Sequence, residues 1–298
     1  MTKNEFKKIT KTYSKMTIEY FFISYFLLSI LYCQIVPNIT MKIIGNGTIA
    51  LFSKYLSPKY EGEVPYKINL DGEDKFGIKD YIYLNEMKVH EIKIFWDKAI
   101  DTTRNMFYNN ENITELDFSN FDTSEVTEMD SMFRGCSSLT SINLNNINTK
   151  LVKTMSWMFS GCVNLTSINL PNLRALNLIR IDYMFYNCKN LKILNLSNFT
   201  APSLTTIAEL FYECKNLLSF DLSNFNSSLL SPLENILPVG CKKIIYIDLS
   251  NLNAPNITSM SSLFNGYKSL LTVNLFNLNA IKLRSIYVTF QTNTPPPP

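Results

Sequence analysis

The sequence contains a single histidine, His90, and only nine glycines among its 298 residues. Histidine is the commonest general acid–base residue, and glycine-rich loops bind phosphates. A chain with so few of both lacks the residues from which common active sites are built. The chain also has no Gly-x-Ser-x-Gly motif, no phosphate-binding loop and no histidine-rich metal motif. We therefore expect no enzyme, no cofactor and no metal site, and we expect His90 on a strand surface.

The folded part of the chain lacks an excess of basic residues. The formal net charge of +3 is accounted for by residues 1–33, where five lysines oppose two glutamates, and the remainder is balanced. A protein that binds nucleic acid carries a basic stripe on its folded surface. We therefore expect no nucleic-acid partner.

Residues 1–33 resemble a targeting segment. A lysine-rich start runs into Tyr20–Cys33, which carries no charge over 14 residues. That length is typical of a signal peptide and short for a bilayer span, although continuing through Val36 leaves an uncleaved signal anchor open. Cys33 also leaves a lipid anchor open, but bulky Tyr32 stands where a small residue is wanted. In each case the lysines stay cytoplasmic and the rest is extracellular or at the cell surface, with membrane contact only through this segment.

An exported chain can be glycosylated at Asn-x-Ser/Thr sequons if it follows a eukaryotic secretory route. Asn195 also begins a sequon, but it belongs to a column expected to lie on the face of the sheet. The candidate acceptors are Asn38, Asn46, Asn112, Asn164, Asn198, Asn226 and Asn256.

The main positive feature is a repeat of 26 residues, with one step of 27. It is marked by a column of phenylalanines and one leucine, and by a Leu-x-x-Leu-x-Leu pattern that predicts one strand in each repeat. The column is Phe107, Phe133, Phe159, Phe185, Phe211, Leu237, Phe264 and Phe290.

The second half of each repeat changes period. Val126, Met129, Met132, Phe133 and Cys136 are spaced as on one side of a short helix, which Asp122 or Thr123 could cap. We therefore predict an α/β leucine-rich-repeat solenoid, with a parallel sheet on one side and short helices or turns on the other. An asparagine column that includes Asn120, Asn146, Asn251 and Asn277 is expected to satisfy backbone groups at the turns.

These patterns divide the chain into four parts. Residues 1–33 are the signal peptide or anchor, and residues 34–98 are a β-rich unit that caps the solenoid. Residues 99–290 form about seven repeats, and residues 291–298 are a proline-rich tail.

Five of the six cysteines share one phase of the repeat: Cys136, Cys162, Cys188, Cys214 and Cys241. Successive coils stack at about 4.8 Å, which is near disulfide range. Equivalent side chains point in parallel, however, and five is an odd number, so small buried thiols are favoured over disulfides. No histidine accompanies them to build a metal site.

One column of acidic and amide residues should project from the exposed sheet face, beside the large residues Ile193 and Tyr246. Most of its members are Asn, which favours a solubilising ladder over acid–base chemistry, and a glycan-acting enzyme is the least favoured alternative. If the face binds a ligand, large exposed side chains are the first candidates. The candidate binding residues are Asp117, Ile193, Asp221, Tyr246 and Asp248.

The repeat also resembles a known family. Residues 113–139 read ITELDFSNFDTSEVTEMDSMFRGCSSL, and this pattern is similar to the repeat of BspA-like leucine-rich-repeat surface proteins. The likeness extends over roughly 100–290, is closest over 104–170, and weakens at Leu233–Cys241 and at Gly266–Tyr267. The resemblance implies a surface or secreted protein that binds a host, matrix or cell-surface protein, and it supplies no catalytic residues. A passive structural spacer is the alternative function.

Overall fold

Alternating apolar residues make Asn38–Ala50 a long strand, β1, whose inward side chains Ile39, Met41 and Ile43 are buried. This strand belongs to a computed structural model of the protein. The structure describes residues 37–53, 65–77, 81–170, 174–197, 199–223, 227, 229, 241–258, 260, 264 and 267–284. The predicted segments 1–33 and 291–298 lie outside these residues, and the rest of the description concerns the unit formed by residues 38–298.

β1 lies inside a six-stranded sheet of order β3-β2-β4-β1-β5-β6. It pairs antiparallel with β4 on one side and with β5 on the other, so the antiparallel cap continues directly into the first repeat. The cap strands thus lie within the β-rich unit expected at 34–98. The other members are β2 (Lys67–Leu70), β3 (Glu73–Phe76), β4 (Tyr81–Phe95), β5 (Ile113–Asn120) and β6 (Ser141–Asn143).

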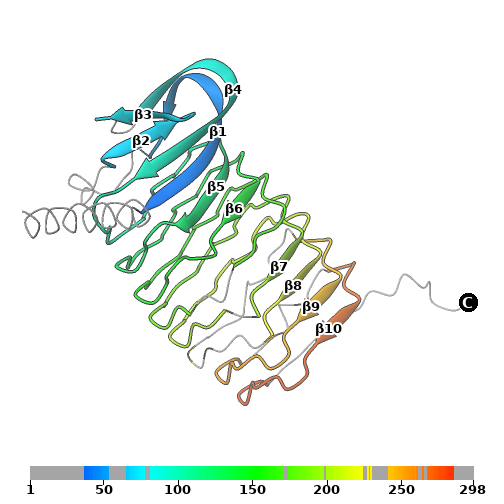
Figure 1. The fold of residues 1–298 in the computed structure, drawn as a ribbon. Coiled ribbons are helices and arrows are strands. Elements are labelled where there is room, and N and C mark those ends of the chain that lie inside the picture. Colours follow the sequence, from blue (N-terminus) through cyan, green and yellow to red (C-terminus); the bar gives the residue numbers. More distant parts are fainter. Residues whose placement is uncertain are drawn as a thin grey trace, which may run out of the picture. The chain divides into compact units, whose positions relative to one another are not determined.

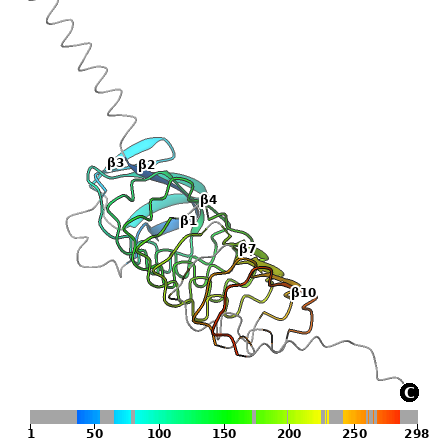
Figure 2. The same ribbon diagram turned by 90° about the horizontal axis from the view of Figure 1, so that it is seen from below.

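The later repeats contribute a second sheet, which is parallel and has the order β10-β9-β8-β7. One three-residue strand per repeat stacks on the next in chain order (Figure 1). Figure 2 shows the same stack turned by 90°, with β1 and β4 near one end and β10 near the other. The strands are β7 (Ile193–Asn195), β8 (Ser219–Asp221), β9 (Tyr246–Asp248) and β10 (Thr272–Asn274).

The phenylalanine column forms the centre of the core. Phe107, Phe133, Phe159, Phe185 and Phe211 have no exposed surface, and each ring stacks on the next at centroid distances of 5.2–6.2 Å. Burial of rings of this size dominates the stability of such a core. The sequence therefore predicted a repeat solenoid correctly.

The predicted short helices are not formed, and the α/β class needs correction. The described residues contain strands and turns but no α-helix. Val126, Met129, Met132, Phe133 and Cys136 are all buried, as the helical spacing required. The expected cap at Asp122 is present only as a local turn, in which its carboxylate accepts the Ser124 N–H at 2.9 Å.

The reason is that the backbone of this half-repeat bonds between coils. The N–H groups of Met129, Ser131, Phe133 and Gly135 donate to carbonyls one repeat further on, at 2.7–3.0 Å. Ser131 and Gly135 also have positive φ, 52° and 77°, which a right-handed helix cannot contain. Inter-coil bonds thus satisfy the backbone in place of a helix, and the coil is a β-solenoid turn.

Candidate functional site

The exposed sheet face holds the five residues singled out from the sequence, but in two places. Ile193, Asp221, Tyr246 and Asp248 lie on the adjacent strands β7–β9, whereas Asp117 lies on β5 in the other sheet. Ile193 is 57% exposed and Tyr246 37% exposed, so both reach solvent as predicted.

The acidic and amide column has a structural task. Asp117, Asp221 and Asp248 each accept the backbone N–H of the residue two positions later, at 2.7–2.9 Å. Asn143, Asn195 and Asn274 make the same bond at 2.8–3.1 Å. These bonds close a turn at the end of each strand. The turn ladder predicted for the Asn120 column is therefore built mainly by this neighbouring column.

The Asn120 column contributes to the turns in a second way. Asn146 donates its side-chain amide to the Ser119 carbonyl at 2.7 Å. Asn251 and Asn277 adopt φ of 54° and 52°, a conformation that asparagine tolerates better than most residues.

Tyr246 and Asp248 form a local pair on β9, with the tyrosine hydroxyl donating to Asp248 Oδ2 at 2.5 Å. This hydrogen bond, together with partial burial, raises the pKa of Tyr246. Partial burial works to raise the pKa of Asp248, but hydrogen bonds from Tyr246, Ser250 and Asn274 outweigh it and lower that pKa. The most polar part of Tyr246 is thus already engaged within its own strand.

The five cysteines of the repeats are free buried thiols, as predicted. Each donates to the backbone carbonyl of a phenylalanine in the preceding coil, with Sγ 3.1 Å from the oxygen. Burial raises the pKa of Cys136, Cys188 and Cys241 to about 12, and also raises those of Cys162 and Cys214. Thiols with such pKa values are not nucleophiles at neutral pH.

The prediction for His90 is wrong, because this residue is buried with 4% exposure. Its Nδ1 lies 2.7 Å from Asp71 Oδ2, and its Nε2 lies 3.0 Å from the Glu86 carbonyl oxygen. The ring therefore ties the turn between β2 and β3 to β4. Within the described ranges no group of three His, Cys, Asp or Glu side chains could hold a metal ion.

Two candidate glycosylation sites take part in contacts within the chain. The Asn112 side chain donates to the Ile44 carbonyl at 3.0 Å, and Asn256 Oδ1 accepts the Lys282 ammonium at 2.9 Å. Asn46 and Asn164 are exposed, and Asn38 is half-buried. Asn198 and Asn226 lie outside the described residues.

The most developed surface cluster lies on the turns rather than on the sheet. We call it the aromatic row, and it consists of Arg134, Trp157, Tyr183, Tyr186 and Tyr212, all half-buried. Trp157 and Tyr183 stack with centroids 4.1 Å apart and planes at 9°, and Tyr186 and Tyr212 stack at 5.1 Å and 4°. The Arg134 guanidinium covers the other face of Trp157 at 4.3 Å. The two stacks join where Trp157 meets Tyr186 at 5.5 Å.

Trp157 and Tyr183 occupy a position with unusual backbone geometry. Their φ angles are 62° and 58°, and the same phase of other repeats holds Asn105, Ser131 and Glu209, also with positive φ. A bulky residue in this left-handed region carries a strain of about 1–3 kcal/mol. Non-aromatic polar residues suffice elsewhere at this phase, so the two aromatic side chains are not required by the turn.

Backbone bonds between coils hold the row in place. The Trp157 N–H donates to the Asp182 carbonyl and the Tyr183 N–H to the Ala208 carbonyl, both at 3.0 Å. The half-buried Asp130 carboxylate accepts the N–H of Ser156, beside Trp157, at 3.0 Å. The row is thus a preorganised surface of Trp, Tyr and Arg, the residue types that dominate protein-binding hot spots. The sequence signal was the 26-residue spacing of Trp157 to Tyr183 and of Tyr186 to Tyr212, outside the core columns.

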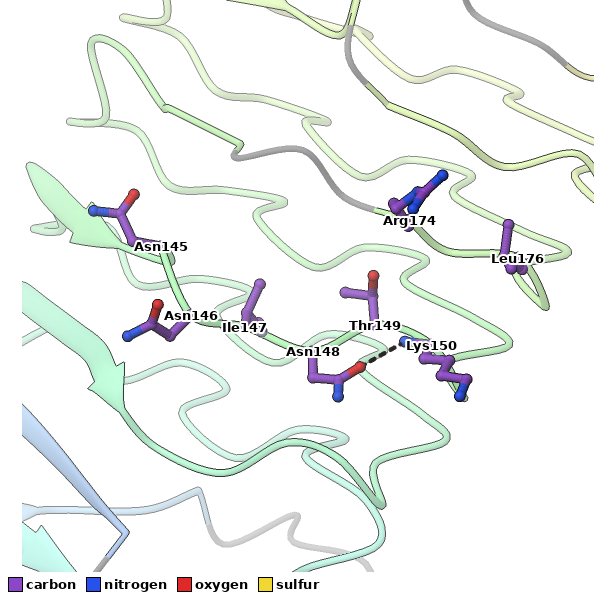
Figure 3. Close-up of a pocket in the computed structure, with 8 residues that line it drawn as sticks. All are labelled: Asn145, Asn146, Ile147, Asn148, Thr149, Lys150, Arg174 and Leu176. Atoms are coloured by element: carbon purple, nitrogen blue, oxygen red, sulfur yellow. Dashed lines mark hydrogen bonds between the residues drawn. The ribbon is translucent and has the colours of Figure 1, made fainter. Parts of the chain in front are cut away.

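A hollow of about 540 Å³ lies on another side of two neighbouring coils (Figure 3). Figure 3 shows Asn148 accepting the Lys150 N–H, a bond of 3.0 Å, beside Thr149, Arg174 and Leu176. Three of the eight lining residues are asparagines and two are cations, and the lining brings no acid–base pair together.

Comparison with known proteins yields one family. A family described as "Mycoplasma protein of unknown function, DUF285" matches residues 80–193 and 179–295. No curated protein and no solved structure matches the chain. The residues that the structure describes contain no helix long and apolar enough to cross a bilayer.

Proposed function

The chain belongs to the DUF285 family, and from this membership and the geometry of the aromatic row we propose that it is a surface or secreted solenoid that binds a protein ligand. Adhesion or recognition is the use that fits such a molecule. The specific BspA-like identity and the export of the chain are parts of this proposal.

The aromatic row is the observation that supports binding. It gathers an indole, three phenols and a guanidinium on one side of successive coils, and it keeps two of the aromatic residues in strained conformations. The turn imposes positive φ at this phase in five successive repeats, so bulky rings there add strain that other residues avoid, and such strain is concentrated at functional sites. Large rigid aromatic side chains also lose little conformational entropy on binding.

The sheet face offers a weaker alternative surface. Ile193 is 57% exposed, which leaves apolar area available. The polar groups beside them are already used, however, because the carboxylates close turns and the Tyr246 hydroxyl bonds Asp248. We therefore assign recognition to the aromatic row.

The test is a screen of the full chain against purified extracellular-matrix and cell-surface proteins, in three forms. These are the wild type, Trp157→Asn, and the double variant Ile193→Ala/Tyr246→Ala as the matched control. We expect a ligand that the wild type and the sheet-face variant bind and that Trp157→Asn loses by at least about tenfold. Binding that survives Trp157→Asn but fails in the sheet-face variant would move the site to the sheet, and absence of any ligand would favour a passive spacer.

Export has its own test. The lysine-rich start and the uncharged Tyr20–Cys33 segment support it. Intact cells that express the chain should expose residues 38–298 to added protease, whereas full protection until the cells are lysed would contradict export.

A further inference from the structure

We infer that the ligand segment recognised by the aromatic row is a proline-rich stretch of a partner protein in the polyproline II conformation, flanked by an acidic residue. This inference rests on the proposed function and names the chemistry of the partner. It follows from the hydrogen-bonding character of the row, from the spacing of its side chains and from its charge.

The row offers hydrogen-bond donors without partners. Within the described part of the chain, no hydrogen bond is made by the Arg134 guanidinium, by Trp157 Nε1–H or by the hydroxyls of Tyr183, Tyr186 and Tyr212. A proline residue has a carbonyl acceptor but no N–H, and polyproline II leaves its carbonyls free of internal bonds. A surface of aromatic rings edged with donors therefore complements a segment of apolar rings and free acceptors.

The spacing of the row also fits this conformation. Polyproline II advances about 9.3 Å per turn of three residues, and two solenoid coils advance about 9.6 Å. Arg134 and Tyr186 occupy the same phase two coils apart, and Trp157 of the middle coil contacts both. Successive prolines on one side of the ligand would thus meet equivalent points of the row. An extended strand repeats every 6.6–6.8 Å or so and matches neither one coil nor two.

The charge of Arg134 indicates which kind of residue flanks the proline-rich segment of the ligand. Arg134 makes a cation–π contact with Trp157 and, among the described residues, no ion pair. Its guanidinium can bind a carboxylate through two parallel hydrogen bonds. An acidic residue next to the prolines is therefore favoured over a basic one.

Ring geometry argues against a glycan as the ligand. A sugar binds an aromatic residue by lying on an open ring face. Both faces of Trp157 are occupied, one by Arg134 at 4.3 Å and the other by Tyr183 at 4.1 Å. At Trp157 only the ring edge is therefore left to a ligand, and a sugar has no face of this indole to lie on.

Trp157 supplies a direct readout. The chain has two tryptophans, and Trp96 is buried with 2% exposure, so a change in emission on adding a small ligand reports on Trp157. The probes are three synthetic nonapeptides added to the full chain: Glu followed by eight prolines, Lys followed by eight prolines, and Glu followed by eight alternating Ala and Gly residues. Cellohexaose serves as the glycan probe.

We expect a saturable change in emission with the Glu–proline peptide, weaker binding of the Lys–proline peptide by about threefold or more, and none with the Ala/Gly peptide. Tyr183→Asn should weaken the Glu–proline peptide at least about fivefold, while Ile193→Ala/Tyr246→Ala should change it less than about twofold. Calorimetry with Trp157→Asn repeats the test without the fluorophore. Asn occupies this phase at Asn105, so both row variants keep a side chain that the turn accepts.

Equal binding of the proline and Ala/Gly peptides, or no binding of either up to millimolar concentration, would overturn the inference. Binding of cellohexaose alone would assign the row to glycans and overturn it as well. A protein ligand that depends on Trp157 but contains no proline-rich segment would also overturn it, while leaving the proposed function intact. The proposed function itself would be contradicted only by a protein ligand that binds Trp157→Asn as tightly as it binds the wild type.

Discussion

The thiol of Cys162 donates a hydrogen bond to the backbone carbonyl of Phe133, with Sγ 3.1 Å from the oxygen. The bond links one coil to the next within the core, and four other cysteines repeat it. The same carbonyl also accepts the Cys136 N–H at 3.1 Å, so the thiol supplies its second hydrogen bond, and the cysteine column does more than fill space. It is the reason that a small apolar residue with a donor recurs at this phase.

Cys162→Ala should lower the free energy of unfolding by about 0.5–2 kcal/mol, because the Phe133 carbonyl loses one of its two donors and a small void remains. Denaturant unfolding of the full chain measures this change. Ser141→Ala, at an exposed strand position, is the control and should change stability by less than about 0.5 kcal/mol. Equal stability of the two variants would show that the thiol bond contributes nothing.

Stability should fall at alkaline pH because the thiols are harder to ionise in the folded chain. Burial raises the pKa of Cys136, Cys188 and Cys241 from an ordinary value of 9.0 to about 12. Their stabilisation is therefore complete below pH 9 and is lost as the pH rises from 9 towards 12. Each thiol contributes a slope of up to about 1.4 kcal/mol per pH unit.

Unfolding free energies at pH 8, 9 and 10 check this slope. The triple variant Cys136→Ala/Cys188→Ala/Cys241→Ala starts less stable but should lose less between pH 9 and 10. Parallel curves for the two proteins would mean that the loss comes from other groups.

His90→Ala should destabilise the cap by about 1–3 kcal/mol, since the Glu86 carbonyl and Asp71 lose a buried partner. Partial burial alone would raise the pKa of Asp71. The hydrogen bonds from His90 and from the Glu91 N–H outweigh this effect, and the net result is a pKa below the ordinary value of 3.8. The contribution of Asp71 is therefore present above that pH and is lost as the pH falls below it. Hydrogen exchange of β2 and β4 between pH 6 and pH 3 would detect both effects, and protection that is unchanged by His90→Ala would refute the link.

Trp157→Asn should leave the free energy of unfolding within about 1 kcal/mol of the wild type. The variant loses the Arg134 contact and the Tyr183 stack, each worth about 0.5–1.5 kcal/mol, but relieves strain of similar size at φ 62°. Thermal and denaturant unfolding test the balance. A loss above about 3 kcal/mol would make Trp157 a structural residue and would remove the argument for a binding role.

The repeat was readable from the sequence because the core of a solenoid repeats its side chains. Phe133, Cys162 and the strand residues follow a fixed period. Residues that recur at this period can all be buried together when successive repeats stack as a solenoid. The helix prediction failed because Val126–Cys136 satisfies helical spacing and inter-coil packing equally well. What decides between them is the backbone, which donates to the next coil and turns left-handed at Ser131.

The candidate site was harder to predict because it depends on neighbours that differ between repeats. The sheet-face column was correctly placed on the strands, but Asp221 and Asp248 are engaged in turn closure, which spacing alone does not reveal. Trp157 and Tyr183 carried a periodic signal, yet only the structure shows that their rings stack under Arg134. His90 was misplaced because its partner Asp71 is 19 residues away in the chain.

Hydrogen exchange distinguishes the aromatic row from the strand face as the surface that binds the ligand. The measurement compares the full chain with and without a protein ligand found by the screen. We expect new protection at the turns around Arg134, Trp157 and Tyr183–Tyr186, with β7–β9 unchanged. Protection confined to β7–β9, with the turns unaffected, would contradict it.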